Sequence, residues 1–239
     1  MLCELVMLFW TDGVPESTRT RNCSFAWNRF QNLEKILQNE GLDVVCRLVD
    51  HSPEKIFTTG NVTHDPYPLG TYKRSEKINK ILFNSDSQFI GIMDSDAFLH
   101  ENQSHAIIDM FKRMEPKNAY TFDLKDIDNW ESIIDFKEHT IDIDNITYTS
   151  RFPGHCNPGL GGFFICCTDT LKSKNGFNED FKTWGGEDGD VFSKLWDDSS
   201  IGTYKVNEIN VWHIPHFCDR ENSLYFNREE YMRLNNLLG

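Results

Sequence analysis

The chain of 239 residues is long enough to bury a hydrophobic core, and its 39% hydrophobic and 13% aromatic content is typical of a globular protein rather than a disordered one. Its formal net charge of −13, with no basic block, argues against nucleic acid or an anionic membrane surface as a partner. These values indicate one domain of ordinary size.

The first fifty residues have the pattern of a strand, a helix and a second strand. Residues 2–10 are apolar except for Glu4, which indicates a buried strand. A loop with Gly and Pro follows at residues 11–22, and apolar residues then recur at helical spacing over residues 25–39. Residues 42–49, LDVVCRLV, are mostly apolar again and indicate a second strand. This order predicts a βαβ unit and therefore a parallel sheet.

Helices and strands continue to alternate after an irregular stretch at residues 53–70. The expected elements are a helix at 75–83, a buried strand at 89–93, a helix at 104–114, strands near Tyr120 and Ile146, and a late strand at 204–212. No internal repeat, linker or low-complexity segment divides the chain. We therefore expect one α/β domain over residues 1–239, with a mostly parallel central sheet flanked by helices.

Two acids, Asp94 and Asp96, follow the strand at 89–93 and are separated by Ser95. Ligands of open α/β sheets gather at the carboxyl ends of strands, and two carboxylates there can bind one hard cation. The alternative is a surface turn, because Asp and Ser are common after strands. The glycine and later ligands of an EF-hand are missing.

The segment at residues 161–190 contains the densest group of unusual residues. It begins with Gly161 and Gly162, and two adjacent glycines allow the backbone to approach a ligand closely. It ends in WGGEDGD, which has three acids in four residues directly before a helical apolar rhythm. Capping of that helix is the alternative interpretation, because acids are favoured at a helix start. A cap needs one acid, however, and needs neither the Trp-Gly-Gly nor the upstream Gly-Gly.

This segment resembles the C-terminal signature of the β-1,4-galactosyltransferases and of family 2 relatives, including chondroitin-polymerase-type and polypeptide N-acetylgalactosaminyltransferase-type enzymes. The signature has a GG turn, an NGF triplet and WGGED. All three occur here in order, as Gly161-Gly162, Asn175-Gly176-Phe177 and residues 184–188. Asp94-Ser95-Asp96 then resembles the DxD motif of GT-A glycosyltransferases. The resemblance implies a single GT-A domain, which is a Rossmann-like fold for nucleotide-diphospho-sugar transfer.

The resemblance also implies a metal site. In the family, the acid equivalent to Asp96 is the main metal ligand. Asp94 is a further candidate metal residue and tends towards the ribose or sugar of the donor, where Ser95 is also expected. A histidine at the end of a late strand completes the site; His213 fits best because it follows the strand directly, and His216 is the alternative. A lone histidine there also suits a structural role. A His–Asp set suits Mn²⁺, with Mg²⁺ as the alternative, and the cation would offset the negative charge of an acidic protein and a nucleotide diphosphate.

The catalytic roles come from the same resemblance. Transfer with inversion needs a base for the proton of the acceptor hydroxyl, and a carboxylate beside another carboxylate has a raised pKa. In WGGED enzymes the base is the Asp, which implies Asp188, while Glu187 holds sugar hydroxyls. The implied acceptor-binding residues are Trp184, Gly185, Gly186 and Glu187. The galactosyltransferases have a further acid where this chain has Gly189, which leaves the acceptor open.

The donor-binding assignments rest on weaker matches. Arg19 or Arg21 in the first loop would contact phosphate or uridine, unless that loop is merely solvated. Asp50, at the end of the second strand, resembles the acid that reads uracil. Arg74 and Asn79 match an R-x-x-x-x-N pattern near the uridine diphosphate, with an exposed helix face as the alternative. Gly161, Gly162, Asp94 and Ser95 complete the implied donor site.

The sequence therefore predicts a metal-dependent glycosyltransferase with a UDP-sugar donor. It would move a hexose or N-acetylhexosamine, with Gal or GalNAc favoured, to a hydroxyl of a carbohydrate or glycoconjugate, with inversion. A retaining transferase of the same fold, a non-catalytic sugar- or nucleotide-binding module and a metal-dependent phosphohydrolase are the alternatives. The donor sugar, the acceptor, the linkage and the oligomeric state stay open.

Cysteine usage and the first residues bear on the compartment. There are seven cysteines and no CxxC pair, which predicts buried free thiols in a reducing compartment. Residues 1–10 are apolar but lack a basic n-region and are too short to span a bilayer. We expect a cytoplasmic protein without a transmembrane segment, and peripheral membrane association stays open.

Overall fold

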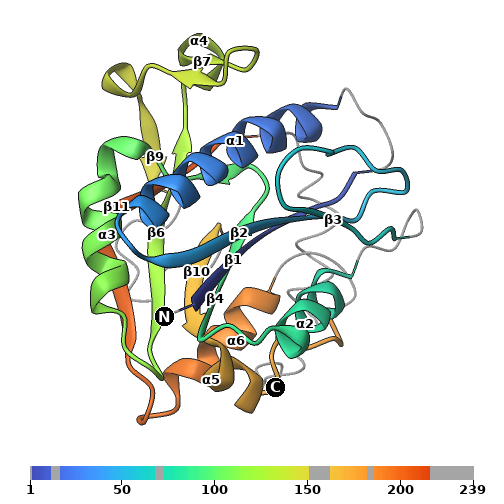
Figure 1. Cartoon of the computed structure of the whole chain (residues 1–239), viewed down its shortest axis with the longest axis vertical. Helices are drawn as coiled ribbons and strands as arrows, with labels where there is room; N and C mark the ends of the chain where they lie inside the picture. The colour runs from blue at the N-terminus through green and yellow to red at the C-terminus, as the bar shows by residue number, and fades with distance from the viewer. Residues whose placement is uncertain (1, 12–16, 68–72, 151–161, 182–185, 216–239) are drawn as a thin grey trace, which may run out of the picture.

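The computed structural model describes residues 2–11, 17–67, 73–150, 162–181 and 186–215. Within these residues, a mixed central sheet of nine strands has the order β3-β2-β1-β4-β10-β6-β11-β5, with β9 paired to β6 outside this path (Figure 1). The strands are β1 (Leu2–Phe9), β2 (Asp43–Asp50), β3 (Val62–His64), β4 (Phe89–Asp94), β5 (Ala97–Phe98), β6 (Ala119–Ile127), β9 (Tyr148–Ser150), β10 (Phe163–Cys167) and β11 (Thr203–His213). The helices are α1 (Thr18–Asn39), α2 (Arg74–Asn84), α3 (Ser104–Arg113), α4 (Trp130–Ile133), α5 (Thr168–Ser173) and α6 (Glu187–Trp196), with 3₁₀ turns η1 (Glu101–Gln103) and η2 (Ile143–Asn145).

One half of the sheet is parallel, in the order β3-β2-β1-β4. β1 pairs with β2 along its whole length, from Leu2 opposite Asp43 to Phe9 opposite Asp50, and α1 connects the two strands. The βαβ unit expected from the first fifty residues is therefore confirmed. Because the strands are parallel, their carboxyl ends share one edge, where β2 ends at Asp50 and β4 at Asp94.

The other half of the sheet is mixed, which corrects the expectation of a mostly parallel sheet. β10 runs antiparallel to both β4 and β6, whereas β6 and β11 pair in parallel. β10 is buried at every residue, so its apolar run has no feature that indicates strand direction. The antiparallel register places Phe163 opposite Met93, which brings the glycine turn before β10 to the end of β4.

α1 and α2 cover opposite faces of the sheet (Figure 1). β1 explains how one strand serves both faces: Leu5 and Met7 join the core cluster under α1, and Val6 and Leu8 join the cluster under α2. Successive side chains of a strand point to opposite faces, so a strand that is covered twice is apolar throughout. The two clusters confirm the expected layers of helix, sheet and helix.

α1 begins at Thr18, earlier than the helix expected at residues 25–39. The Ser17 side chain caps it by accepting a hydrogen bond of 3.1 Å from the Thr20 N–H. Arg19 and Arg21 therefore lie in the first helical turn rather than in a loop. The residues of this first turn are polar, so the spacing of apolar residues does not indicate that the helix begins there.

An excursion between β6 and β9 carries α4 and a two-stranded ribbon of β7 (Ile134–Asp135) and β8 (Thr140–Ile141). It projects beyond the end of the sheet, at the top of Figure 1. The Arg21 guanidinium lies over the rings of Phe136 and Trp130, 4.1 and 4.9 Å from their centroids, and ties the excursion to α1. The strand expected near Ile146 is β9, two residues further along.

The five cysteines of the described residues, Cys3, Cys23, Cys46, Cys166 and Cys167, are buried and form no disulfide with one another. Burial raises the pKa of the Cys3, Cys23 and Cys46 thiols, so these side chains stay protonated and serve packing. None of the helices in the described ranges is long and apolar enough to cross a bilayer.

Candidate active site

The DxD residues meet the glycine turn through a reciprocal pair of hydrogen bonds. The Asp94 N–H donates to the Gly162 carbonyl at 2.8 Å, and the Gly162 N–H donates to Asp94 Oδ2 at 3.1 Å. Gly162 has φ of +100°, and an added Cβ would lie 2.5 Å from Leu124 Cδ1. Only glycine suits this conformation and this spacing. Gly161 lies outside the described residues.

The acids of the WGGED segment come from the first turn of α6. The helix begins after Gly186, which has φ of +89°, and the Gly186 carbonyl accepts a hydrogen bond of 3.0 Å from the Asp190 N–H. Glu187, Asp188 and Asp190 occupy the first turn, where the helix dipole favours negative charge. The acids thus suit the helix dipole, although among the described residues no side chain caps the helix by a hydrogen bond, and Glu187 and Asp188 have a further partner. Trp184 and Gly185 lie outside the described residues.

That partner is Arg74, at the first position of α2. Its Nη2 donates to Asp94 Oδ1 at 2.9 Å, and its Nη1 donates to Asp188 Oδ1 at 2.8 Å and Glu187 Oε1 at 3.2 Å. One guanidinium thereby joins the DxD motif to the WGGED segment. Arg74 is only 8% exposed, so the alternative of an exposed helix face is wrong for this residue.

The electrostatic setting of Asp188 is unusual for a carboxylate. Burial, together with the charges of Glu187 and Asp94, raises the pKa of Asp188 from its ordinary value of 3.8 to about 7, although Arg74 opposes the rise. Part of that burial is apolar: Asp188 borders a cavity of about 10 Å³ whose other lining side chains include Phe164, Val191 and Phe192. Burial acts to lower the pKa of Arg74, but its three carboxylates outweigh burial and raise that pKa well above the ordinary value, so Arg74 stays charged.

The second part of the site joins His213 to Asp96. β11 pairs with β5, so His213 lies opposite Ala97, and the Ile214 N–H donates to the Asp96 carbonyl at 2.9 Å. This register brings His213 Nε2 to 3.5 Å from Asp96 Oδ1. On its other side, His213 Nδ1 lies 2.7 Å from Asp126 Oδ1, in a hydrogen bond that orients the ring.

The Asp96–His213 pair fits a divalent cation in its chemistry. A carboxylate and an imidazole are both ligands of Mn²⁺, and two ligand atoms about 2.1 Å from one ion lie about 3.0–3.5 Å apart when they are near neighbours in its shell. A carboxylate on the second imidazole nitrogen is the usual support for a metal-binding histidine. The described ranges contain no group of three His, Cys, Asp or Glu side chains placed for a metal, and His216 lies outside them. Both carboxylate oxygens of Asp94 already accept hydrogen bonds, one from the Arg74 guanidinium and one from the Gly162 N–H.

Asp50 and Asn79, which were expected on the donor side, have clear structural contacts. Asp50 is fully buried, and its carboxylate accepts hydrogen bonds from the N–H groups of Ser52, Ile56 and Phe57 at 3.0, 2.7 and 3.3 Å. It therefore holds the loop after β2. Its contact with a nucleobase stays a prediction.

Asn79 holds the NGF triplet. Its Nδ2 donates to the Phe177 carbonyl and its Oδ1 accepts from the Phe177 N–H, both at 2.8 Å. Asn175 and Gly176 both have φ of +61°, and an added Cβ on Gly176 would clash with Asn79 Oδ1. The triplet thus forms a left-handed turn pinned to α2. Donor contacts of Asn79, Arg19 and Arg21 also stay predictions.

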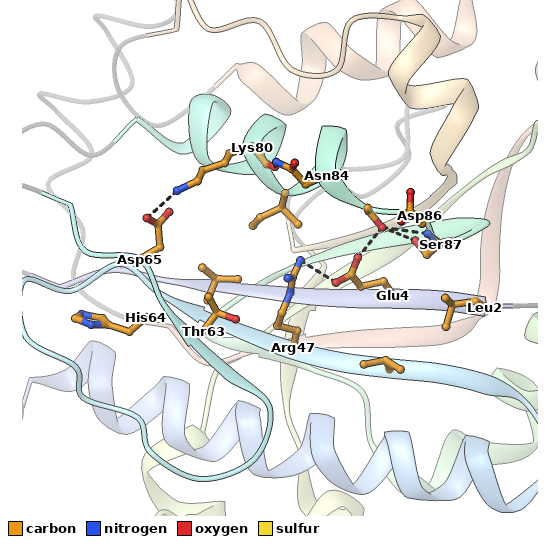
Figure 2. Close-up of a pocket in the computed structure, with 14 residues that line it drawn as sticks. Leu2, Glu4, Arg47, Thr63, His64, Asp65, Lys80, Asn84, Asp86 and Ser87 are labelled. Atoms are coloured by element: carbon orange, nitrogen blue, oxygen red, sulfur yellow. Dashed lines mark hydrogen bonds and ion pairs between the residues drawn. The ribbon is translucent and has the colours of Figure 1, made fainter.

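A larger groove lies elsewhere, between α2 and the strands β1 to β3 (Figure 2). Its volume is about 590 Å³. Two ion pairs join residues that line it: Glu4 with Arg47 at 2.8 Å and Asp65 with Lys80 at 2.9 Å. α2 packs on β1 and β4 beside the groove, and the connection from β2 to β3 has no helix. It is lined by none of the residues that we predicted for the site.

Sequence reasoning missed two features of the site. Asp126 gave no signal, because its role depends on the parallel register that places it opposite His213. Arg74 was expected at the donor, but its three carboxylate partners lie 20, 113 and 114 residues away in the chain. The local signals are its position at the start of a helix and the R-x-x-x-x-N match, and neither indicates burial.

Comparison with known proteins gives the family context. Residues 143–216 match a family model described as the N-terminal domain of galactosyltransferase. No curated protein sequence matches the chain. The structure is similar to the catalytic domain of Drosophila β1,4-galactosyltransferase 7 in complex with xylobiose, with a TM-score of 0.57, 13% identity, and coverage of 97% of this chain and 79% of that one. A mutant of the Drosophila enzyme in complex with manganese, UDP-Gal and xylobiose has a TM-score of 0.54 at 13% identity, covering 98% and 80%.

Two further structures are similar at the same level. GalNAc-T7 with UDP, GalNAc and Mn²⁺ has a TM-score of 0.56 and 12% identity over 90% of this chain and 43% of that one. S. aureus TarS has a TM-score of 0.56 and 14% identity over 98% and 64%. At these identities the likeness establishes the fold. The expected resemblance to GT-A glycosyltransferases is confirmed, and the matched segment supports the assignment to glycosyltransferases.

Proposed function

We propose that this chain, which has the GT-A glycosyltransferase fold, transfers a hexose or N-acetylhexosamine from a UDP-sugar to an acceptor hydroxyl, with inversion and with a divalent metal. The observation that carries the proposal is the contact of one buried guanidinium with both Asp94 and Asp188. This contact brings Asp94 of the DxD motif and Asp188 of the WGGED segment to one side chain, which supports the proposal that the two motifs form one site. A sugar donor held at the DxD motif would then meet an acceptor that is activated at the WGGED segment.

Asp188 is the proposed base. As the acceptor oxygen attacks the anomeric carbon, the bond from that carbon to the UDP oxygen breaks, its electron pair leaves with UDP, and the hydroxyl proton passes to Asp188. A pKa of about 7 suits this task, because the carboxylate is then both available and basic near neutral pH. Arg74 engages Oδ1, and among the described residues Oδ2 accepts no hydrogen bond, so Oδ2 is the oxygen proposed to take the proton.

Asp96 and His213 are the proposed metal ligands, and Asp126 is proposed to hold the His213 ring in place. A divalent cation bound there would neutralise the diphosphate and stabilise the leaving UDP. Mn²⁺ is favoured because similar structures hold manganese, and Mg²⁺ is the alternative. The chain itself carries a net charge of −13, so it gains from a cation when it binds an anionic donor.

The donor and acceptor are proposed from the matched family and the similar structures. Galactose is favoured by the galactosyltransferase model and the UDP-Gal complex, and N-acetylgalactosamine by the GalNAc-T7 complex. A carbohydrate acceptor is supported by the xylobiose complexes. Glu187 and Gly186, together with Trp184 and Gly185, are the proposed acceptor-side residues.

A thermal-shift panel of nucleotides and nucleotide sugars, with and without Mn²⁺, tests the donor and the metal together. A ligand that binds only the folded state raises the melting temperature. We expect UDP-sugars to raise it when Mn²⁺ is present and to do much less in EDTA. Equal shifts with and without the metal would contradict metal-dependent binding, and the absence of a shift with every UDP compound would contradict the donor class.

A retaining transferase of the same fold is the second candidate, because GalNAc-T7 is as similar in structure as the galactosyltransferase. Both reactions use the same donor and metal, so binding does not separate them. The anomeric configuration of the product, measured by NMR, does. Inversion relative to the UDP-sugar supports the base role of Asp188, and retention would contradict it.

A further inference from the structure

We infer that Arg74 is a positioning residue for the transfer reaction, which fixes Asp188, Glu187 and Asp94 in one arrangement and does not serve mainly as a contact for the donor. This inference rests on the proposed function. It concerns how the carboxylates of the site are held, and it assigns to Arg74 a role that acts through those side chains.

The contacts of Arg74 reach two separate elements of the fold. The two terminal nitrogens of Arg74 donate hydrogen bonds in different directions. Nη2 donates to Asp94 at the end of β4, and Nη1 donates to Glu187 and Asp188 at the start of α6. A guanidinium is planar and rigid, so two directions of bonding from one group fix the relative position of their partners. Arg74 thereby sets the spacing between β4, a strand of the sheet, and α6, a helix far along the chain.

The charges around Arg74 need a common partner, because three carboxylates meet one guanidinium. Arg74 and Glu187 are 8% and 1% exposed, and the side chains of Asp94 and Asp188 are 22% and 18% exposed. Repulsion among carboxylates that are largely removed from water is strong, since water does not screen it well. Without the guanidinium, these side chains would separate or bind protons, and the arrangement needed for transfer would be lost.

The hydrogen-bond donors at the end of the Arg74 side chain are already in use. Both terminal nitrogens of Arg74 already donate to carboxylates within 3.2 Å, and the side chain is buried. A phosphate that took over these donors would leave up to three carboxylates without their common partner, which is costly in a buried site. Positioning therefore explains the contacts better than direct binding of the diphosphate.

The test is the Arg74→Lys variant, which keeps the positive charge but loses the two terminal guanidinium nitrogens that contact β4 and α6. We expect kcat to fall by about 10²-fold, because a small misplacement of reacting groups has that effect, whereas the KM for the donor changes by less than about threefold. Arg74→Ala should be slower still, and added guanidinium, well below concentrations that unfold the protein, should restore part of its kcat. Arg47→Lys is the matched control, because Arg47 is also paired with a carboxylate but lies in the separate groove.

The outcomes separate this inference from the function on which it depends. If the wild-type protein transfers no sugar from any UDP-sugar, the proposed function fails. If the wild type is active but Arg74→Lys raises the donor KM and leaves kcat unchanged, Arg74 is a donor contact and the inference is overturned. Loss of folding in both Arg74 variants, seen by circular dichroism while Arg47→Lys stays folded, would assign Arg74 to stability and also overturn it.

Discussion

Asp188 is held by opposing influences: Arg74 favours its charged form, while burial and two neighbouring carboxylates favour its neutral form. Asp188→Asn removes the proton acceptor but keeps the size of the side chain and an oxygen for Arg74. We expect kcat to fall by about 10²–10⁴-fold, the usual contribution of a general base, while UDP and Mn²⁺ binding measured by calorimetry stay close to wild type. Full activity of the variant would show that another group takes the proton.

The raised pKa of Asp188 also predicts the pH dependence of the rate. With a pKa of about 7, the carboxylate form increases as the pH rises through 7, so kcat/KM should rise over that range and then level off. A pH–rate profile at saturating metal concentration measures this rise in kcat/KM. A rate that is flat from pH 5 to 9 would contradict a base with this pKa.

The same shift has a consequence for stability, with a defined sign. The folded pKa of about 7 exceeds the ordinary value of 3.8, so the folded state binds the proton more tightly. The stability that Asp188 contributes is complete below about pH 4 and is lost as the pH rises to about 7. Denaturant unfolding of wild type and Asp188→Asn should therefore show a difference in unfolding free energy that changes over this window. A constant difference would argue against the shift.

Asp126 is predicted to act on metal binding through His213. Asp126→Asn weakens the partner that orients the imidazole, and such changes cost about 10–100-fold in metal affinity. Titration of Mn²⁺ in the presence of UDP measures the effect. The matched control is Asp123→Asn, on the same strand, where Asp123 pairs with Lys205 at 2.6 Å. Equal Mn²⁺ affinities in all three proteins would remove Asp126 from the site.

At the scale of single residues, the sequence predicted the acids and the histidine as site residues but did not predict their connections. Asp94, Asp96, Glu187, Asp188 and His213 were predicted because motif spacing and resemblance are local in sequence. The role of Arg74 as the common partner of three carboxylates was not predicted, because burial and long-range pairing depend on the folded chain. Asp126 was missed for the same reason.

At the scale of elements, the turn before β10 carries a prediction. In Gly162→Ala, the positive φ would cost about 1–2 kcal/mol, and the contact with Leu124 would add about 1–3 kcal/mol. The turn bonds Asp94, so activity should fall as well. Gly41→Ala is the control, because Gly41 also has a positive φ, +75°, but an added Cβ there meets nothing within 4 Å. Equal loss of stability in the two variants would contradict the close-packed turn.

The elements themselves were largely readable from apolar spacing. The strand expected at 89–93 is β4 and the helix expected at 75–83 is α2, each within about a residue at either end. α1 was predicted too short because a side-chain cap and a polar turn start it. The direction of β10 was not readable, since a doubly covered strand has the same pattern in either orientation.

At the scale of the whole molecule, the sheet explains why distant motifs meet. The parallel half brings the ends of β2 and β4 to one edge, and antiparallel β10 returns its preceding glycine turn to that edge. β11 then places His213 beside Asp96 through its pairing with β5. The mixed half of the sheet, which the sequence did not predict, is therefore the half that assembles the proposed metal pair.

The most direct test of the account is the release of UDP from UDP-galactose and UDP-N-acetylgalactosamine, since slow donor hydrolysis needs no known acceptor. We expect the wild-type protein to release UDP with Mn²⁺ and to stop in EDTA, and we expect Asp96→Asn and Asp188→Asn each to lower the rate. Metal-dependent release that is lost in both variants would place the two acids in one working site. UDP release that is unchanged in either variant, or no release and no binding with any UDP-sugar, would contradict it.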